Sequence, residues 1–204
     1  MMQALRVVTS AAVLAAVMAN CSRLDDTPPL SEAQPQRPPP SPTAEPPVAT
    51  EQHVDPQGEP NRVVIPAIDV DVELVRLGLK ADGAMQVPDF GFAGWYTEGP
   101  KPGHPGPAVI AAHVDSRAGP DAFYRLGDLT AGDVIRVVYD SGDEVTFLVE
   151  SREQTSKDEL PVDTIWPTTN ERLLALITCS GEFDRSVRHY RDNLIVYAHH
   201  MIGG

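Results

Sequence analysis

Leu173-Leu-Ala-Leu-Ile-Thr-Cys179-Ser-Gly181 places five apolar residues directly before a threonine and a cysteine, and a Ser-Gly turn signal follows at once. A short apolar run that is bounded by a turn signal predicts a buried strand. Cys179 would then lie at the mouth of that strand, held rigidly but open to a substrate. A cysteine is a strong nucleophile once a partner stabilises its thiolate, although a strand-end cysteine is more often a small buried hydrophobic residue. The surroundings of Cys179 therefore decide between these two roles.

The charge of the chain excludes some classes of partner. It carries 16 basic and 29 acidic residues, for a net charge of -13. Residues 61–204, which contain 13 of the basic and 22 of the acidic residues, are enough for one domain with a sizeable core. The sequence has no dense basic patch, so we expect no nucleic-acid partner and no binding to anionic lipid surfaces.

The first 60 residues differ in kind from the rest. Residues 7–19 are apolar apart from Thr9 and Ser10, and Arg6 precedes them. This length suits a signal-peptide core, and Met18-Ala19-Asn20-Cys21 is similar to a lipobox, so residues 1–21 are expected to be a signal peptide or a membrane or lipid anchor. Residues 22–60 hold 11 of the 20 prolines and little that could be buried. They are expected to form a disordered Pro-rich linker, either a stalk or a tail without a role.

If the protein is exported, the number of its cysteines is informative. The chain has two cysteines, Cys21 and Cys179, and Cys21 belongs to the targeting segment. The folded domain then keeps a single thiol in a compartment where lone thiols are a liability. Catalysis is the commonest reason to retain one. We expect the protein at the extracellular face of the membrane, in the cell wall or secreted.

Short strands dominate the pattern after residue 61. Apolar runs or alternation separated by Gly, Pro and Asp predict strands at 62–65, 70–75, 85–87, 108–112, 134–139, 145–149, 173–178 and 194–198. Helical periodicity is scarce, and only 120–126 and 157–160 are expected to form helical turns. This pattern predicts an all-β domain, either a closed barrel or a sandwich.

His113 is the first candidate partner for the cysteine. It follows the apolar run 108–112, so it would lie where that strand ends, and Asp115 could orient it or belong to a surface turn. A histidine in this place is usually structural, but opposite Cys179 it could act as an acid and a base. No His/Cys pair has zinc spacing, so we expect neither a metal nor another cofactor.

Arg191 is the candidate charged group. It precedes the predicted last strand, 12 residues after Cys179, and a guanidinium suits an oxyanion or a peptide carbonyl. Arg185 and Arg188 in the same loop are rivals. Each of the three could also be an exposed surface arginine.

The combination of motifs resembles a sortase of class F, a group found in Gram-positive bacteria. The motifs are His113-Val-Asp-Ser116, Phe123-Tyr-Arg-Leu-Gly-Asp128, Leu176-Ile-Thr-Cys179 and Tyr190-Arg-Asp-Asn193 ahead of Val196-Tyr-Ala198. The resemblance covers about 61–201. Two positions depart from the family's pattern: Ala112 stands where glycine commonly precedes the histidine, and Asn193 stands where many sortases have the arginine. Arg191 lies two residues earlier, on the same face of an extended strand.

The resemblance implies an eight-stranded β-barrel with short helical turns, in which residues 61–204 form the catalytic domain. It implies a cysteine transpeptidase that cleaves a Leu-Pro-x-Thr-Gly-like sorting signal between Thr and Gly and passes the acyl group to a cell-wall amine. The catalytic residues would be Cys179, His113 and Arg191, with Arg188 in reserve. The sorting peptide and the wall amine would be its partners, and the protein would be a monomer.

Three alternatives stay open at this point. An L,D-transpeptidase is disfavoured because its Ser-x-Gly-Cys-x-x-Arg signature is absent. A thiol hydrolase on the sortase scaffold would cleave the peptide but use water as acceptor. A binding module on the same fold would hold a sorting peptide without processing it.

Overall fold

The apolar run 173–177 forms the first part of strand β9 (Arg172–Asp184) in the computed structural model, which describes residues 54–201. Leu174 and Leu176 point into the main core, whereas Ala175 and Ile177 belong to a second buried cluster on the other face. Because successive side chains of a strand point to opposite faces, a strand that is buried on both faces has an unbroken apolar run. This is why the run shows no alternation.

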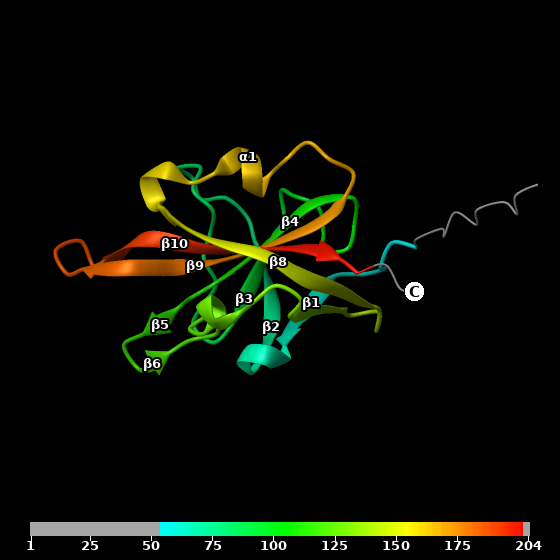
Figure 1. Cartoon of the computed structure of the whole chain (residues 1–204), viewed down its shortest axis with the longest axis horizontal. Coiled ribbons are helices and arrows are strands. Elements are labelled where there is room, and N and C mark those ends of the chain that lie inside the picture. The colour runs from blue at the N-terminus through cyan, green and yellow to red at the C-terminus, as the bar shows by residue number, and fades with distance from the viewer. Residues whose placement is uncertain (1–53, 202–204) are drawn as a thin grey trace, which may run out of the picture. The chain divides into compact units, whose positions relative to one another are not determined.

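Eight strands close into a barrel in the order β1-β2-β3-β4-β9-β10-β8-β7, with β7 returning to β1 (Figure 1). The pairs β2–β3 and β4–β9 are parallel and the others are antiparallel. The other strands are β1 (Pro60–Ile65), β2 (Val70–Leu77), β3 (Ala93–Tyr96), β4 (Gly106–Ala112), β7 (Val134–Tyr139), β8 (Glu144–Ser156) and β10 (His189–His200). The predicted all-β class and eight-stranded barrel are therefore confirmed.

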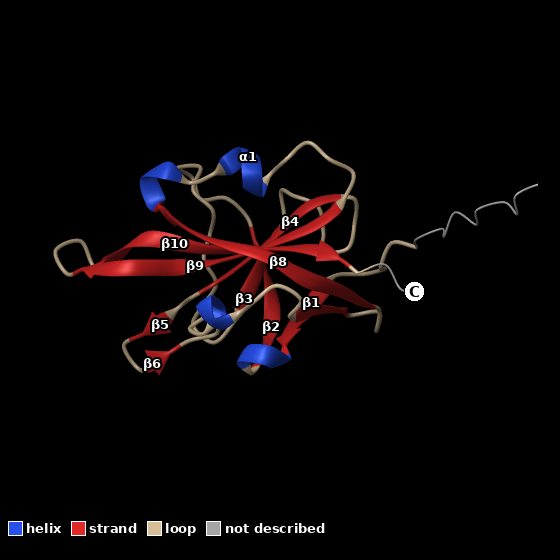
Figure 2. Ribbon diagram, viewed as in Figure 1, coloured by secondary structure: helices blue, strands red, loops and turns tan. Residues whose placement is uncertain are grey.

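In the described part of the chain, helices are few and short, as Figure 2 shows. They are the 3-10 turns η1 (Pro66–Ile68), η2 (Leu126–Asp128) and η3 (Lys157–Glu159), and the single α-helical turn α1 (Val162–Ile165). Between residues 54 and 201 no helix is long and apolar enough to cross a membrane.

The predicted turn at 157–160 corresponds to η3, whose first residue follows the capping side chain of Ser156. The predicted turn at 120–126 is borne out only in part. Tyr124 N donates to the carbonyl of Asp121 and Leu126 N to that of Phe123, but the 3-10 turn η2 begins only at Leu126. Residue 120 lies in a two-stranded hairpin, β5 (Asp115–Ser116) and β6 (Gly119–Pro120).

Two strand predictions also differ from the structure. Residues 85–87 form no strand, and Met85 makes only an isolated bridge to Leu79. Strand β3 was not predicted, since Ala93-Gly-Trp-Tyr96 is short and contains a glycine. That glycine has a packing role: a Cβ on Gly94 would lie 2.4 Å from Cγ of Leu77. The absence of a side chain lets β2 and β3 approach closely.

The described structure begins within the predicted linker. Residues 55–59 lie against the barrel: Gln57 N donates to Asp143 Oδ2 at 2.7 Å, and Glu59 N donates to Asp140 Oδ1 at 2.9 Å. Lys101 Nζ donates to the carbonyl of Gly58 at 2.7 Å. The predicted targeting segment 1–21 and residues 22–53 of the predicted linker lie outside the described residues.

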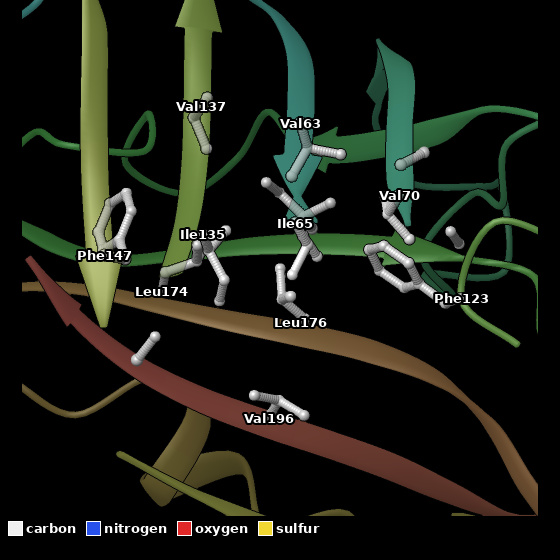
Figure 3. Packing of buried hydrophobic residues seen from close by; sticks show 14 of the residues in the cluster. Val63, Ile65, Val70, Phe123, Ile135, Val137, Phe147, Leu174, Leu176 and Val196 are labelled. Carbon is white, nitrogen blue, oxygen red and sulfur yellow. The ribbon is translucent and has the colours of Figure 1, made fainter. Parts of the chain in front are cut away.

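The barrel interior is filled by apolar side chains from most of the strands (Figure 3). Val63 and Ile65 from β1 lie beside Val137 and Ile135 from the neighbouring β7, with Leu176 from β9 close to them. Leu176 is fully buried at the centre of this cluster. The barrel therefore has a packed core rather than a channel.

We expect Leu176→Ala to lower the free energy of unfolding by about 2–5 kcal/mol, because it leaves a cavity that the closed barrel cannot collapse to fill. Urea unfolding followed by fluorescence measures this loss. Leu79→Ala is the matched control, since Leu79 is 47% exposed and its truncation should cost under about 0.5 kcal/mol. Equal losses in the two variants would contradict the assignment of Leu176 to the core.

Candidate active site

Cys179 lies on β9 and pairs with Asn193 of β10. It is half-buried and is a free thiol. Its side chain shares the outer face of β9 with Ile177, since residues two apart on a strand point the same way. The predicted position at the end of the strand is wrong, because β9 continues to Asp184. Cys179 lies instead where β4, the parallel neighbour of β9, has ended.

The predicted Ser180-Gly181 turn is a β-bulge. The β9–β10 ladder pairs Ser180 with Asp192 and then Phe183 with Tyr190, so β9 has one residue more than β10 between these pairs. Gly181 takes a φ of 77° at this point. Bulges of this kind commonly place a glycine in the left-handed region and strengthen the local twist. The chain reverses only after Asp184.

His113 follows the last residue of β4. The parallel register pairs Ala111 with Ile177, so two residues further along it brings His113 beside Cys179. If the register is extended, both residues lie on the outer face, on chain segments about 4.8 Å apart. Thr178, which is 4% exposed, donates its hydroxyl to the carbonyl of Ala112 at 2.8 Å. This bond joins the residue before the histidine to the residue before the cysteine.

The loop between β2 and β3 holds the imidazole of His113. Nε2 lies 3.0 Å from the carbonyl oxygen of Pro88, and the ring of Phe90 lies 4.5 Å from the His113 ring between centroids. A carbonyl oxygen only accepts hydrogen bonds, so Nε2 carries a proton and Nδ1 is the nitrogen that can exchange one. Gly91 N donates to Asp121 Oδ1 at 2.9 Å, which fixes this loop to the segment that follows His113.

Asp115, which the sequence left open between orienting His113 and a surface turn, bonds another residue. Its Oδ2 accepts from the hydroxyl of Tyr190 on β10 at 2.5 Å. This hydrogen bond, followed by burial and by the nearby charges of Asp115 and Cys179, raises the pKa of Tyr190 to about 12. The phenol therefore stays protonated near neutral pH. The sequence offered no signal for this pair, because its members lie 75 residues apart.

Arg191 lies inside β10, which begins at His189, rather than before the last strand. Its side chain is 61% exposed, and Nη2 lies 3.1 Å from Oδ2 of Asp184. The hydrogen bonds from Ser186 are the main cause, and Arg191 a smaller one, of the lowered pKa of Asp184, about 2. A lowered carboxyl pKa means that the charge pair is complete above the ordinary value of 3.8 and is lost as the pH falls towards 2.

The rival arginines lie in the turn between β9 and β10. Arg185 and Arg188 are both exposed, and Arg188 has a φ of 56°. Arg191 is on the strand that pairs with the cysteine strand, two residues before Asn193, the partner of Cys179. Of the three arginines, Arg191 is therefore the one that lies on the strand paired with the cysteine strand.

Lys157 is the residue that the sequence did not point to. Its Nζ donates to Sγ of Cys179 at 3.4 Å, and both side chains are half-buried. It is the first residue of η3, in the connection between β8 and β9. The path of that connection across β9 cannot be inferred from local sequence.

The other histidines that the structure describes lie elsewhere. His104 faces Asp55 at 3.8 Å, His189 is exposed at the start of β10, and His199 and His200 are at the far end of that strand. Within residues 54–201, no group of three or more His, Cys, Asp or Glu side chains could hold a metal ion. The chemistry available at the site is that of a thiol, an imidazole and two cations.

The sequence and fold were compared with known proteins. The family model of the sortase domain matches residues 63–201. This chain belongs to the sortase family. Sortases are cysteine transpeptidases, so membership supports acyl transfer through a cysteine. No curated protein matches the chain.

Solved sortase structures share the fold of this sortase. The lid mutant of sortase A from Corynebacterium diphtheriae has a TM-score of 0.55 at 19% identity, covering 71% of each chain. Sortase C-1 from Actinomyces oris has a TM-score of 0.54 at 22% identity, covering 70% of this chain and 72% of that one. The sortase D5 transpeptidase of Clostridium perfringens has a TM-score of 0.52 at 19% identity, covering 71% of this chain and 79% of that one. At such identities the likeness concerns the fold alone.

Gly181→Ala tests the bulge beside Cys179. A Cβ there would lie 2.3 Å from Oδ2 of Asp192, in addition to the strain of the positive φ. Gly142→Ala is the control, because Gly142 has a φ of 92° and nothing within 4 Å of the added Cβ. We expect Gly142→Ala to lower the free energy of unfolding by about 1 kcal/mol and Gly181→Ala by about 2 kcal/mol or more, measured by urea unfolding. Equal losses would contradict close packing at the bulge.

Proposed function

We propose that this sortase is a class F transpeptidase that cleaves a Leu-Pro-x-Thr-Gly-like sorting signal between Thr and Gly and transfers the acyl group to a cell-wall amine. The observation that carries the proposal is the register of β4 and β9, which brings His113 beside Cys179. Class F is supported by the Tyr190-Arg-Asp-Asn193 run. Export is supported by the composition of residues 1–21, and we propose that the protein acts as a monomer on the outer side of the membrane.

In the proposed first half-reaction, the thiolate of Cys179 attacks the carbonyl carbon of the Thr-Gly bond. A C–S bond forms while the carbonyl electron pair moves to oxygen. The intermediate collapses, the C–N bond breaks, and the departing glycine amine takes a proton from Nδ1 of the His113 imidazolium. General acid catalysis of this kind supplies typically 10²–10⁴-fold, because an amine leaves poorly without a proton.

In the second half-reaction, an amine attacks the thioester carbon and gives its proton to the now neutral Nδ1 of His113. Collapse breaks the C–S bond and returns the thiolate and the imidazolium. The carbonyl of Pro88 accepts from Nε2 throughout, which keeps the ring orientation and leaves the same nitrogen to give and take the proton. Arg191 would stabilise the oxyanion after exchanging its contact with Asp184 for one with the substrate.

The function is tested with the full chain carrying Cys21→Ser, a set of Leu-Pro-x-Thr-Gly peptides, and hydroxylamine or a glycine amine. We expect mass spectrometry to detect cleavage after Thr and a Thr-amine adduct. Cys179→Ala should abolish the adduct, since no nucleophile then remains. Cleavage to the acid alone, with good amines present, would favour the thiol hydrolase. Peptide binding without an adduct, an acid or a Cys179 acyl-enzyme would contradict catalysis and favour a binding module.

The choice of arginine is tested separately. We expect Arg191→Ala to lower the rate of acyl transfer by about 10²-fold, because a donor to the oxyanion is lost. Arg188→Ala is the control, since Arg188 lies in the exposed turn of the same hairpin and should retain nearly the full rate. The reverse order of effects would move the role to Arg188.

A further inference from the structure

The cation that touches the candidate nucleophile is Lys157. Its Nζ lies 3.4 Å from Sγ of Cys179, within hydrogen-bond distance for sulfur. Arg191, by contrast, directs its guanidinium to Asp184 at 3.1 Å and is 61% exposed. The sulfur therefore already has a cationic neighbour without any movement of Arg191.

The strand registers hold Lys157 in this place. Ser156 at the end of β8 pairs with Asp192 of β10, and Asp192 pairs with Ser180 of β9. Since β8 and β9 are both antiparallel to β10, they run in the same direction, and Ser156 ends β8 level with Ser180, one residue from Cys179. The hydroxyl of Ser156 accepts from Asp158 N at 3.3 Å and caps η3, which turns the chain at once. The pairing of the three strands thus brings the end of β8 to the level of Cys179, and the turn into η3 places the Lys157 ammonium against its sulfur.

The charges around the sulfur favour this role. Among the ion pairs of residues 54–201, Lys157 has no carboxylate partner, and its neighbours Asp158 and Glu159 are exposed. His113 follows β4 on the other side of β9. A cation in direct contact with a thiol stabilises the thiolate, and a half-buried contact is screened less by water and salt than an exposed one.

We propose that Lys157 is a catalytic residue of this sortase, whose ammonium stabilises the thiolate of Cys179 for attack on the sorting signal. The proposal rests on the proposed function for its substrate, but the stabilisation itself can be measured without one. The two cations then have different roles. The Lys157 ammonium stabilises the sulfur before acylation, and the Arg191 guanidinium stabilises the substrate oxygen during acylation. His113 is then left to exchange protons with the two amines.

The test measures alkylation of Cys179 by iodoacetamide, a neutral reagent, in the full chain carrying Cys21→Ser. Peptide mapping by mass spectrometry gives the rate at Cys179 at pH 7 and at pH 9.5, where an ordinary thiol is mostly ionised. The ratio of the two rates separates ionisation from access. We expect Lys157→Met to lower the pH 7 rate about three- to tenfold with a smaller change at pH 9.5. Lys157→Arg should keep most of the rate.

Lys80→Met is the matched control, because Lys80 is an exposed lysine of the β2–β3 loop and should leave both rates unchanged. If Lys157→Met does not fold, as judged by circular dichroism, Lys157→Gln takes its place. Equal pH 7 to pH 9.5 ratios in the wild type and the folded Lys157 variant would overturn the proposal. A lowered ratio in a protein that transfers no sorting peptide would keep the Lys157 contact and reject the proposed function instead.

Discussion

The hydrogen bond from Thr178 to the carbonyl of Ala112 is the constraint on which the site depends. It is made by a buried hydroxyl where β4 ends, at a point where a free carbonyl would be costly. This bond adds to the parallel ladder that aligns two strands from distant parts of the chain, and its two residues are 66 apart. The cysteine and the histidine are the next residues on each side, so the geometry of the chemistry follows from the pairing of the scaffold.

The two faces of β9 pack against different parts of the protein. Leu174 and Leu176 complete the barrel interior, while Ala175 and Ile177 pack under Ile165 of α1 and Ile195 of β10. Cys179 continues the outer face just beyond this second cluster. Cys179 is thus supported by packed apolar side chains behind it and by the bulged end of the hairpin ahead of it. The Cys179 side chain is therefore held in place although it is only half-buried.

The sequence predicted the strands whose residues carry their own signal. Residues 173–177 are apolar because β9 is buried on both faces, and the hairpin of β7 and β8 has its turn at Asp140-Ser-Gly-Asp143. Features that depend on distant contacts were missed. Gly94 in β3 is needed for the approach of Leu77. Lys157 meets Cys179 because β8, β10 and β9 pair at this level and the chain turns into η3 there. The end of a strand was likewise mistaken at Gly181, because a bulge glycine and a turn glycine have the same local signature.

The ends of the described chain meet on one side of the barrel. Asp140 N donates to the carbonyl of Glu59, and Met201 N donates to that of Thr146, so both ends lie beside the β7–β8 turn. Asn193, the partner of Cys179, is seven residues of β10 before His200, about 24 Å away on an extended strand. In Figure 1 the β9–β10 hairpin accordingly extends away from the side where the chain enters and leaves. A short peptide could join the two ends of the described chain into a circular permutant. A bead or a fusion partner could also be attached at either end, on the side of the barrel opposite the Cys179 thiol.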